Sequence, residues 1–171
     1  MPTFTDLQAD APAIADFLGA RIADTGLCLL GTTRHDGWPR VSPIELSLVD
    51  GRLYVGSMPA GVKATDLQRD PRCCLLTPLA DKDDLAGEAK AFCLAREVVE
   101  VREWERVRGA FRDATGFDIG DPGGAHMFEL SIEAAAWQRV EGDDWRTTSW
   151  RAGGVVRERA RNGPTGASHD L

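Results

Sequence analysis

The sequence predicts a mainly β fold, in which antiparallel strands close or nearly close into a barrel with flanking helices. Two observations predict it. About seven short segments are rich in apolar residues at strand spacing, and most of them are joined by tight turns such as Asp36-Gly37 and Asp50-Gly51. Parallel strands would need long crossover connections, so these turns favour an antiparallel barrel over a parallel α/β sheet.

The length of the chain predicts one domain. A chain of 171 residues can bury one good core and is too short for two ordinary domains. We expect this domain to span residues 1–157, with a helix at its N-terminal end. Residues 158–171 lack an apolar face and predict a mobile C-terminal tail.

The first expected element is an amphipathic helix over residues 10–26. Its apolar residues recur at helical spacing on one stripe: Ile14, Phe17, Leu18 and Ile22. Gly26 can end the helix in a left-handed conformation. Because one face is apolar and the other polar, this helix is expected to pack against the barrel.

Three strands joined by tight turns follow, over residues 27–33, 40–49 and 52–58. They predict an antiparallel meander. Pro43 lies inside the second strand and has no N–H to donate to a ladder. It therefore indicates an open edge, a bulge or a neighbouring ligand at that point.

The second half of the chain continues the pattern, with strands expected over residues 72–78, 89–101, 126–140 and 145–152. A short helix over 62–70 ends at Asp70-Pro71. A longer helix over 103–116 carries an apolar stripe of Trp104, Val107, Ala110, Phe111 and Ala114. The acidic segment 79–88 predicts a solvated loop, and residues 141–144 predict a turn between the last two strands.

Composition and charge exclude several classes of partner. The net charge of -7 disfavours nucleic acid, because nucleic-acid binders gather Lys and Arg on a basic face. The apolar runs are far shorter than the roughly 20 residues that span a bilayer, and the N-terminus lacks a signal-peptide pattern. We expect a cytoplasmic protein that contacts neither nucleic acid nor a membrane.

Cysteines and histidines do not predict a metal site. The cysteines are Cys28, Cys73, Cys74 and Cys93, and the histidines are His35, His126 and His169. No cysteine pair has the C-x-x-C spacing with which two thiolates hold zinc, and adjacent cysteines on a strand point to opposite faces. The cysteines lie in or beside apolar runs, so we interpret them as small buried hydrophobes in a reducing compartment.

One residue is a candidate for ligand binding. The chain contains no G-x-S-x-G, H-E-x-x-H, G-x-x-x-x-G-K-[ST] or G-x-G-x-x-G motif. Lys63, however, is placed in the first turn of a short helix that follows a strand. Free N–H groups at a helix start attract anions, and an ammonium adds a positive charge, so this position is suited to a phosphate. The alternative interpretation is an ordinary solvated lysine.

The order of several short motifs resembles a known family. The succession "DGWPRVSPIEL", "DGRLYVGSM", "VKATDLQRDPRCCLL" and "SWRAGGVVR" is similar to that of the pyridoxamine 5'-phosphate oxidase-like superfamily, the FMN-binding split barrels. The resemblance covers roughly residues 22–157. It implies a six-stranded antiparallel split β-barrel, usually a homodimer, with FMN or the deazaflavin F420 in a groove between the subunits.

The resemblance also implies which residues bind the cofactor. The backbone of Val41, Ser42, Pro43 and Ile44 would lie against the flavin ring. The end of the next strand and the following helix, with Ser57, Met58 and Lys63, would approach the ribityl chain and phosphate. Trp150, with Arg151, would reach the cofactor groove of the partner. No catalytic residue is implied.

The chain departs from the oxidase branch of the family at two points. An S-R-K triplet usually precedes the short helix, but here the triplet is Gly61-Val62-Lys63, so one phosphate cation stands where two or three are usual. The substrate motif of the oxidases is also missing. The Ser42-Pro43 pair and "SWRAGG" are more similar to actinobacterial flavin- and deazaflavin-dependent reductases, some of whose relatives bind heme.

Two functions follow from the resemblance. The first is an FMN- or F420-dependent oxidoreductase that acts on a small organic substrate. The second is a barrel that binds flavin, F420 or heme without turnover, and heme would then be held through His35 or His126.

Overall fold

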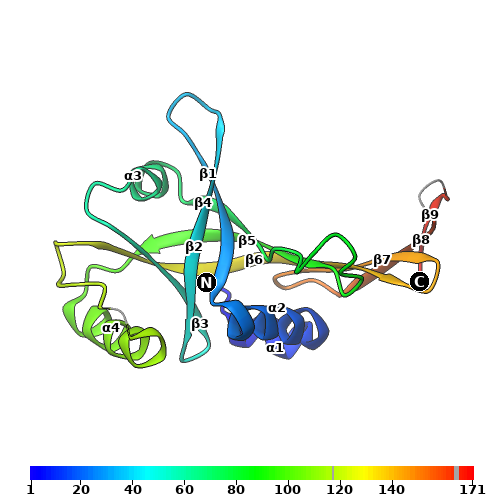
Figure 1. Ribbon diagram of the computed structural model, residues 1–171, viewed down its shortest axis with the longest axis horizontal. Helices are drawn as coiled ribbons and strands as arrows, with labels where there is room; N and C mark the ends of the chain where they lie inside the picture. The colour runs from blue at the N-terminus through cyan, green and yellow to red at the C-terminus, as the bar shows by residue number, and fades with distance from the viewer. Residues whose placement is uncertain (117, 164–165) are drawn as a thin grey trace.

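The computed structural model describes residues 1–116, 118–163 and 166–171. Within these residues the chain forms four helices and nine strands (Figure 1). The helices are α1 (Phe4–Asp10), α2 (Pro12–Thr25), α3 (Val62–Arg69) and α4 (Val101–Thr115). The strands are β1 (Leu27–Thr33), β2 (Pro39–Val49), β3 (Arg52–Ser57), β4 (Arg72–Leu76), β5 (Glu88–Glu97), β6 (His126–Glu141), β7 (Asp144–Arg151), β8 (Arg157–Asn162) and β9 (Ser168–Asp170).

Six of these strands close into a barrel. The sheet runs in the order β3-β2-β1-β4-β5-β6, and a further pairing of β3 with β6 closes the ring among the described residues. All pairings between the named strands are antiparallel. The predicted fold class, a mainly β six-stranded antiparallel barrel with flanking helices, is therefore confirmed.

The sheet continues beyond the barrel as an arm made of β7, β8 and β9 (Figure 1). Strand β6 belongs to both parts. Its first residues, His126 to Leu130, pair with β3 in the barrel, whereas Ala134 to Glu141 pair with β7 in the arm. The register between β5 and β6 shifts at Phe92/Cys93, close to the point where β6 leaves the barrel. Such a bulge bends a strand, which fits the change of direction there.

The interior of the barrel is filled by the inward-facing residues of its strands, such as Leu30, Ile44 and Leu75. Helices α1 and α2 add Leu7, Ile14 and Leu18 to this core from the side that faces the arm, while α3 adds Ala64 and Leu67 from the other side (Figure 1). Gly26 ends α2 with φ 65°, as its sequence position predicted.

Helix α4 covers the outer face of β3 and β6 and forms a second apolar cluster. Trp104 and Val107 of the predicted stripe pack there against Tyr54 and Met127. The side chain of Ala114, the last member of that stripe, lies outside the described part of the structure. No helix among the described residues combines the length and the hydropathy that a bilayer crossing requires.

The structure differs from the sequence expectations at three places. Helix α1 precedes the predicted helix and begins at a capping box, in which Thr3 and Asp6 each bond the backbone N–H of the other. The strand expected over 89–101 ends at Glu97, and α4 begins at Val101. Part of the segment 158–171, expected to be a tail, forms β8 and β9. Strand β8 pairs with β7 and buries Ala160, and β9 pairs with β8, so backbone pairing and not an apolar face holds the two strands.

Candidate functional site

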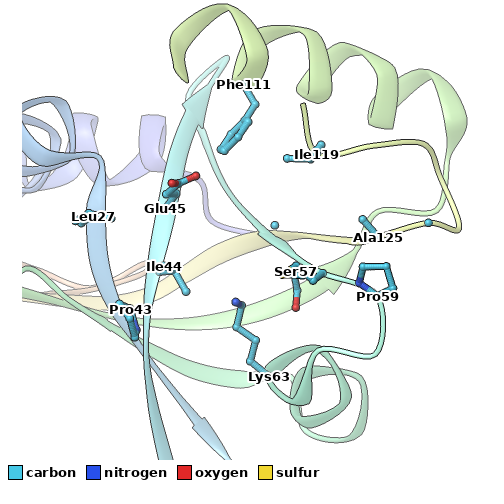
Figure 2. Close-up of a pocket in the computed structure, with 13 residues that line it drawn as sticks. Leu27, Pro43, Ile44, Glu45, Ser57, Pro59, Lys63, Phe111, Ile119 and Ala125 are labelled. Atoms are coloured by element: carbon cyan, nitrogen blue, oxygen red, sulfur yellow. The ribbon is translucent and has the colours of Figure 1, made fainter. Parts of the chain in front are cut away.

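The barrel is split between β2 and β3, and a cleft opens at the split. These two strands pair only where Leu46–Val49 faces Arg52–Val55. Beyond Leu46, β2 continues along β1, whereas β3 beyond Val55 continues along β6. The gap between them is a cleft of about 360 Å³, which α3 and α4 also line (Figure 2).

The backbone of β2 presents an open edge to this cleft. The N–H of Leu46 donates to the carbonyl of Gly26, at the start of β1, over 3.1 Å. Because backbone groups alternate along an antiparallel strand, those of Val41, Pro43 and Glu45 point to the opposite side, toward the split. A proline costs no ladder bond at an open edge. Of the three explanations that the sequence allowed for Pro43, the structure shows the open edge.

A tight turn carries the chain from β3 into α3 at the rim of the cleft. The N–H of Gly61 donates to the carbonyl of Met58 over 3.0 Å, with Pro59 at the second position of the turn. Ala60 occupies the third position with φ 56°, which glycine adopts more readily. A non-glycine residue in this conformation costs about 1 kcal/mol. Strained backbone therefore stands beside the cleft.

Ser57 contributes a buried hydroxyl to the cleft. Its side chain is 8% exposed, and its Oγ is buried without a hydrogen-bond partner among the described residues. A β-carbon at Gly61 would lie 2.3 Å from this oxygen and 2.9 Å from the carbonyl oxygen of Met58. Only glycine allows the start of α3 to approach the end of β3 this closely. An unpaired buried hydroxyl in a cleft is suited to a polar group of a ligand.

The start of α3 provides further donors. Gly61 caps the helix without a side-chain hydrogen bond, and within the described chain the N–H groups of Val62 and Lys63 have no acceptor. The side chain of Lys63 extends into the cleft, and no ion pair or hydrogen bond with another described residue engages it (Figure 2). Two N–H groups, one ammonium and the Ser57 hydroxyl therefore lie at the same end of the cleft, and we call these donors the anion seat, because such groups are suited to an anion.

Asp66 fixes the orientation of α3. Its buried carboxylate accepts hydrogen bonds from Thr32 of β1 at 2.9 Å and Arg40 of β2 at 2.7 Å, and Arg69 lies 3.7 Å away. Burial alone would raise the pKa of Asp66, but the bonds from Arg40 and Thr32 outweigh it, so the pKa lies below the ordinary 3.8. The carboxylate is therefore ionised at neutral pH and holds α3 against β1 and β2.

A second polar group holds the other side of α3. Gln68 donates to Glu97 of β5 at 2.9 Å, and Glu97 contacts Nδ1 of His126 at 2.7 Å. Burial acts to raise the pKa of Glu97, but bonds with His126 and Gln68 lower it below its ordinary value. His126 pairs with Ser57 across β6 and β3, although it does not line the cleft.

The structure brings most of the predicted site residues together. Those that line the cleft are Pro43, Ile44, Ser57, Met58 and Lys63. Val41 and Ser42 lie on the adjoining part of β2 but not in the lining. Trp150 lies elsewhere: its side chain is 3% exposed, and its indole N–H donates to Asp10 at 3.3 Å.

Sequence reasoning missed eight residues of the lining, among which Glu45, Phe111 and Ile119 present large side chains to the cleft. Phe111 was interpreted as helix core, and it is indeed buried, although it also lines the cleft. Glu45 had a detectable signal, because it is the only carboxylate among the residues of β2. Ile119 lies in a connection without periodicity, which leaves no sequence signal to detect.

A six-stranded antiparallel barrel that is split between two of its strands defines the split-barrel class of proteins. The sequence model of one family in this class, described as pyridoxamine 5'-phosphate oxidase, matches residues 14–136. The chain belongs to this family. No curated protein matches the sequence significantly.

Solved structures of other proteins share the fold. ChuZ of Campylobacter jejuni is 12% identical, with a TM-score of 0.69 over 95% of this chain and 67% of that protein. A protein of Clostridium acetobutylicum related to general stress protein 26, from the pyridoxinephosphate oxidase family, is 12% identical, with a TM-score of 0.62 over 83% and 96% of the two chains. A heme binding protein of Mycobacterium smegmatis is 22% identical, with a TM-score of 0.62 over 77% and 56%. At these identities the likeness concerns the fold alone.

Proposed function

We propose that this protein binds FMN or the deazaflavin F420 in the cleft and acts as an oxidoreductase on a small organic substrate. The observation that carries the proposal is the anion seat formed by Lys63, Ser57 and the free N–H groups at the start of α3, directly beside the open edge of β2. Membership of the pyridoxamine 5'-phosphate oxidase family supports the same class of cofactor.

The residues present fit such a cofactor. The cleft volume of about 360 Å³ falls within the range of about 300–1,000 Å³ that is usual for ligand pockets. Lys63 and Ser57 would hold the phosphate, and the free backbone groups of Val41, Pro43 and Glu45 would face the ring edge. When bound, the flavin or deazaflavin supplies hydride transfer, while the chain supplies shape, hydrogen bonds and exclusion of water.

We further propose that the protein is a homodimer with the cleft at its interface. An outward-facing row of residues crosses the sheet beside the cleft: Val41, Gly31, Cys74, Phe92, Ala134 and Arg151. Val41 is 67% exposed and Phe92 is 50% exposed, which is unfavourable for apolar side chains that stay in water. A two-fold axis parallel to the strands would reverse the row and bring Arg151 of a second copy to the Val41 end.

This dimer would supply what the cleft lacks in one chain. Lys63 is the one cation among the described residues that line the cleft. Arg151 and Arg157 line a groove on the arm, and among the described residues neither side chain forms an ion pair or a hydrogen bond. The strand that carries Trp150 and Arg151 would then contribute cations to the partner's cofactor, as the resemblance implied.

The absorption spectrum of the purified protein, followed by titration with FMN and with F420, tests the cofactor. We expect binding of one of them, and Lys63→Met is expected to weaken it about tenfold or more, because a charge-assisted hydrogen bond is lost. Lys82→Met, on an exposed loop where Lys82 pairs with Asp83, is the matched control and should bind normally. No spectral change with FMN, F420 or heme would overturn the proposal.

A second candidate function is cofactor binding without turnover, with heme as the further ligand. The single cation in the cleft favours it, and the fold likeness to a heme binding protein agrees with it. His126, which is oriented by Glu97, is the better candidate ligand, since His35 lies exposed in the β1–β2 turn. A Soret band on heme addition that is lost in His126→Ala would support this function. Turnover with NAD(P)H or reduced F420 would contradict it.

A further inference from the structure

The two ends of the cleft carry opposite charges. Lys63 of α3 lies at one end, and Glu45 of β2 lies toward the other end, where α4 approaches (Figure 2). The lining between and around them is largely apolar. A ligand that fills the cleft therefore meets a cation where α3 begins and a carboxylate on the α4 side.

The carboxylate of Glu45 is not used by the fold. Within the described ranges no hydrogen bond or ion pair engages its side chain, whereas the buried carboxylates Asp66 and Glu129 are each held by two arginines. Glu45 stands opposite Leu27 of β1 in the register, and its side chain lies on the outward face of β2, where it lines the cleft.

Apolar side chains surround this end of the cleft. Phe111 of α4 and Ile119 form one wall, and Leu27 lies beside Glu45 on the neighbouring strand (Figure 2). An aromatic ring is a suitable partner for such walls. The Glu45 side chain is exposed, so its charge acts on a ligand in the cleft with the modest strength of a solvent-accessible ion pair.

We propose that Glu45 determines substrate specificity: the α4 end of the cleft accepts an aromatic molecule that carries an ammonium group and disfavours the corresponding carboxylate. This inference rests on the proposed function, because a molecule at the α4 end would lie next to a cofactor whose phosphate occupies the Lys63 end. It adds the charge and the ring character of the substrate to that function.

Three small probes that share a phenyl ring test the inference: phenethylamine, 2-phenylethanol and phenylacetate. Their dissociation constants for the protein as purified can be measured by NMR titration. We expect the amine to bind most tightly and the carboxylate most weakly. Glu45→Gln should reduce the ratio of amine to carboxylate affinity about fivefold, which corresponds to the loss of one partly exposed ion pair.

Asp24→Asn is the matched control. Asp24 lies exposed on α2, away from the cleft, and its replacement changes the net charge by the same amount. The control should preserve the wild-type ratio, so that a change in Glu45→Gln alone reports a local effect.

Equal binding of the amine and the carboxylate by the wild-type protein would overturn the inference, as would an unchanged ratio in Glu45→Gln or no binding of any probe. These results are independent of the cofactor titrations. Probe selectivity without flavin binding would overturn the proposed function alone, and flavin binding without probe selectivity would overturn this inference alone.

Discussion

Gly61 and Ser57 are so close that a β-carbon on Gly61 would lie 2.3 Å from the Ser57 hydroxyl oxygen. Gly61 has φ -61°, a conformation open to any residue. Glycine is therefore required because a side chain would collide with Ser57, and not because of the backbone conformation. The contact fixes the distance between the end of β3 and the start of α3, and with it the spacing of the donors in the anion seat.

Gly61→Ala should both destabilise the protein and weaken cofactor binding. Forcing a methyl group into this contact is expected to lower the free energy of unfolding by about 1–3 kcal/mol. Urea unfolding and FMN titration measure the two effects. Gly109→Ala is the control, because Gly109 lies within α4 and no atom lies within 4 Å of an added β-carbon there. Alanine favours a helix more than glycine does, so this variant should raise the free energy of unfolding by about 0.5–1 kcal/mol. Equal stability of Gly61→Ala and wild type would contradict the steric argument.

Asp66 should make stability depend on pH in the acid range. Its pKa in the folded protein lies below the ordinary 3.8, so the unfolded chain binds its proton first as the pH falls. The stabilisation is present above about pH 4 and is lost as the pH falls through the lower, folded value. Asp66→Asn should lower the free energy of unfolding by about 2 kcal/mol at pH 7.

Urea unfolding of wild type and Asp66→Asn at a series of pH values from 7 to 3 measures this dependence. The difference in free energy of unfolding between wild type and Asp66→Asn should become smaller as the pH approaches 3. A difference that stays constant over the whole series would show that the ionised carboxylate is not what holds α3.

Phe92→Asp should separate the proposed homodimer into monomers. A carboxylate in the middle of the outward-facing row would be buried without a partner in the interface, which is strongly unfavourable. Light scattering coupled to size exclusion gives the mass directly. Leu85→Asp, at an exposed side chain of the β4–β5 connection, should leave the mass of the dimer unchanged. A monomeric wild-type protein would contradict the proposed dimer, but not the description of the cleft, which the residues of one chain form.

Strand β8 should exchange its amide protons more slowly than the β4–β5 connection. It pairs with β7 over residues 157–162, and Ala160 is 1% exposed. Hydrogen exchange followed by mass spectrometry can compare peptides from 157–163 and 79–87. Equally fast exchange in the two peptides would favour the mobile tail that the sequence predicted.

The barrel strands were predictable because their inward residues alternate. Ile44 and Leu46, for example, both face the core on β2, and Gly51 takes φ 71° in the turn that follows. Strand β8 was not predictable in this way, since Ala160 is its one buried residue and backbone pairing stabilises the rest. Helix α1 has only 7 residues, too few for a periodic stripe, although its capping box was visible in the sequence.

Part of the site was predictable for a different reason. Lys63 and Ser57 lie close in sequence, and the strand, turn and helix between them specify their relation locally. Glu45 and Phe111 line the same cleft only because β2 and β3 diverge and α4 packs across the opening, which depends on long-range packing. The burial of Trp150 depends likewise on Asp10, at the end of a helix 140 residues away in the chain.

Strand β6 has consequences for how the molecule unfolds. Its 16 residues form one strand of the barrel at the N-terminal end and the strand to which the arm is attached at the C-terminal end. The arm therefore cannot be separated from the barrel as an independent module, because a chain cut before β7 would remove the β6 residues with which β7 pairs. Unfolding of the arm and opening of the barrel should therefore occur in one cooperative transition. A label attached to the arm would then change its signal when the barrel, and with it the cleft, opens.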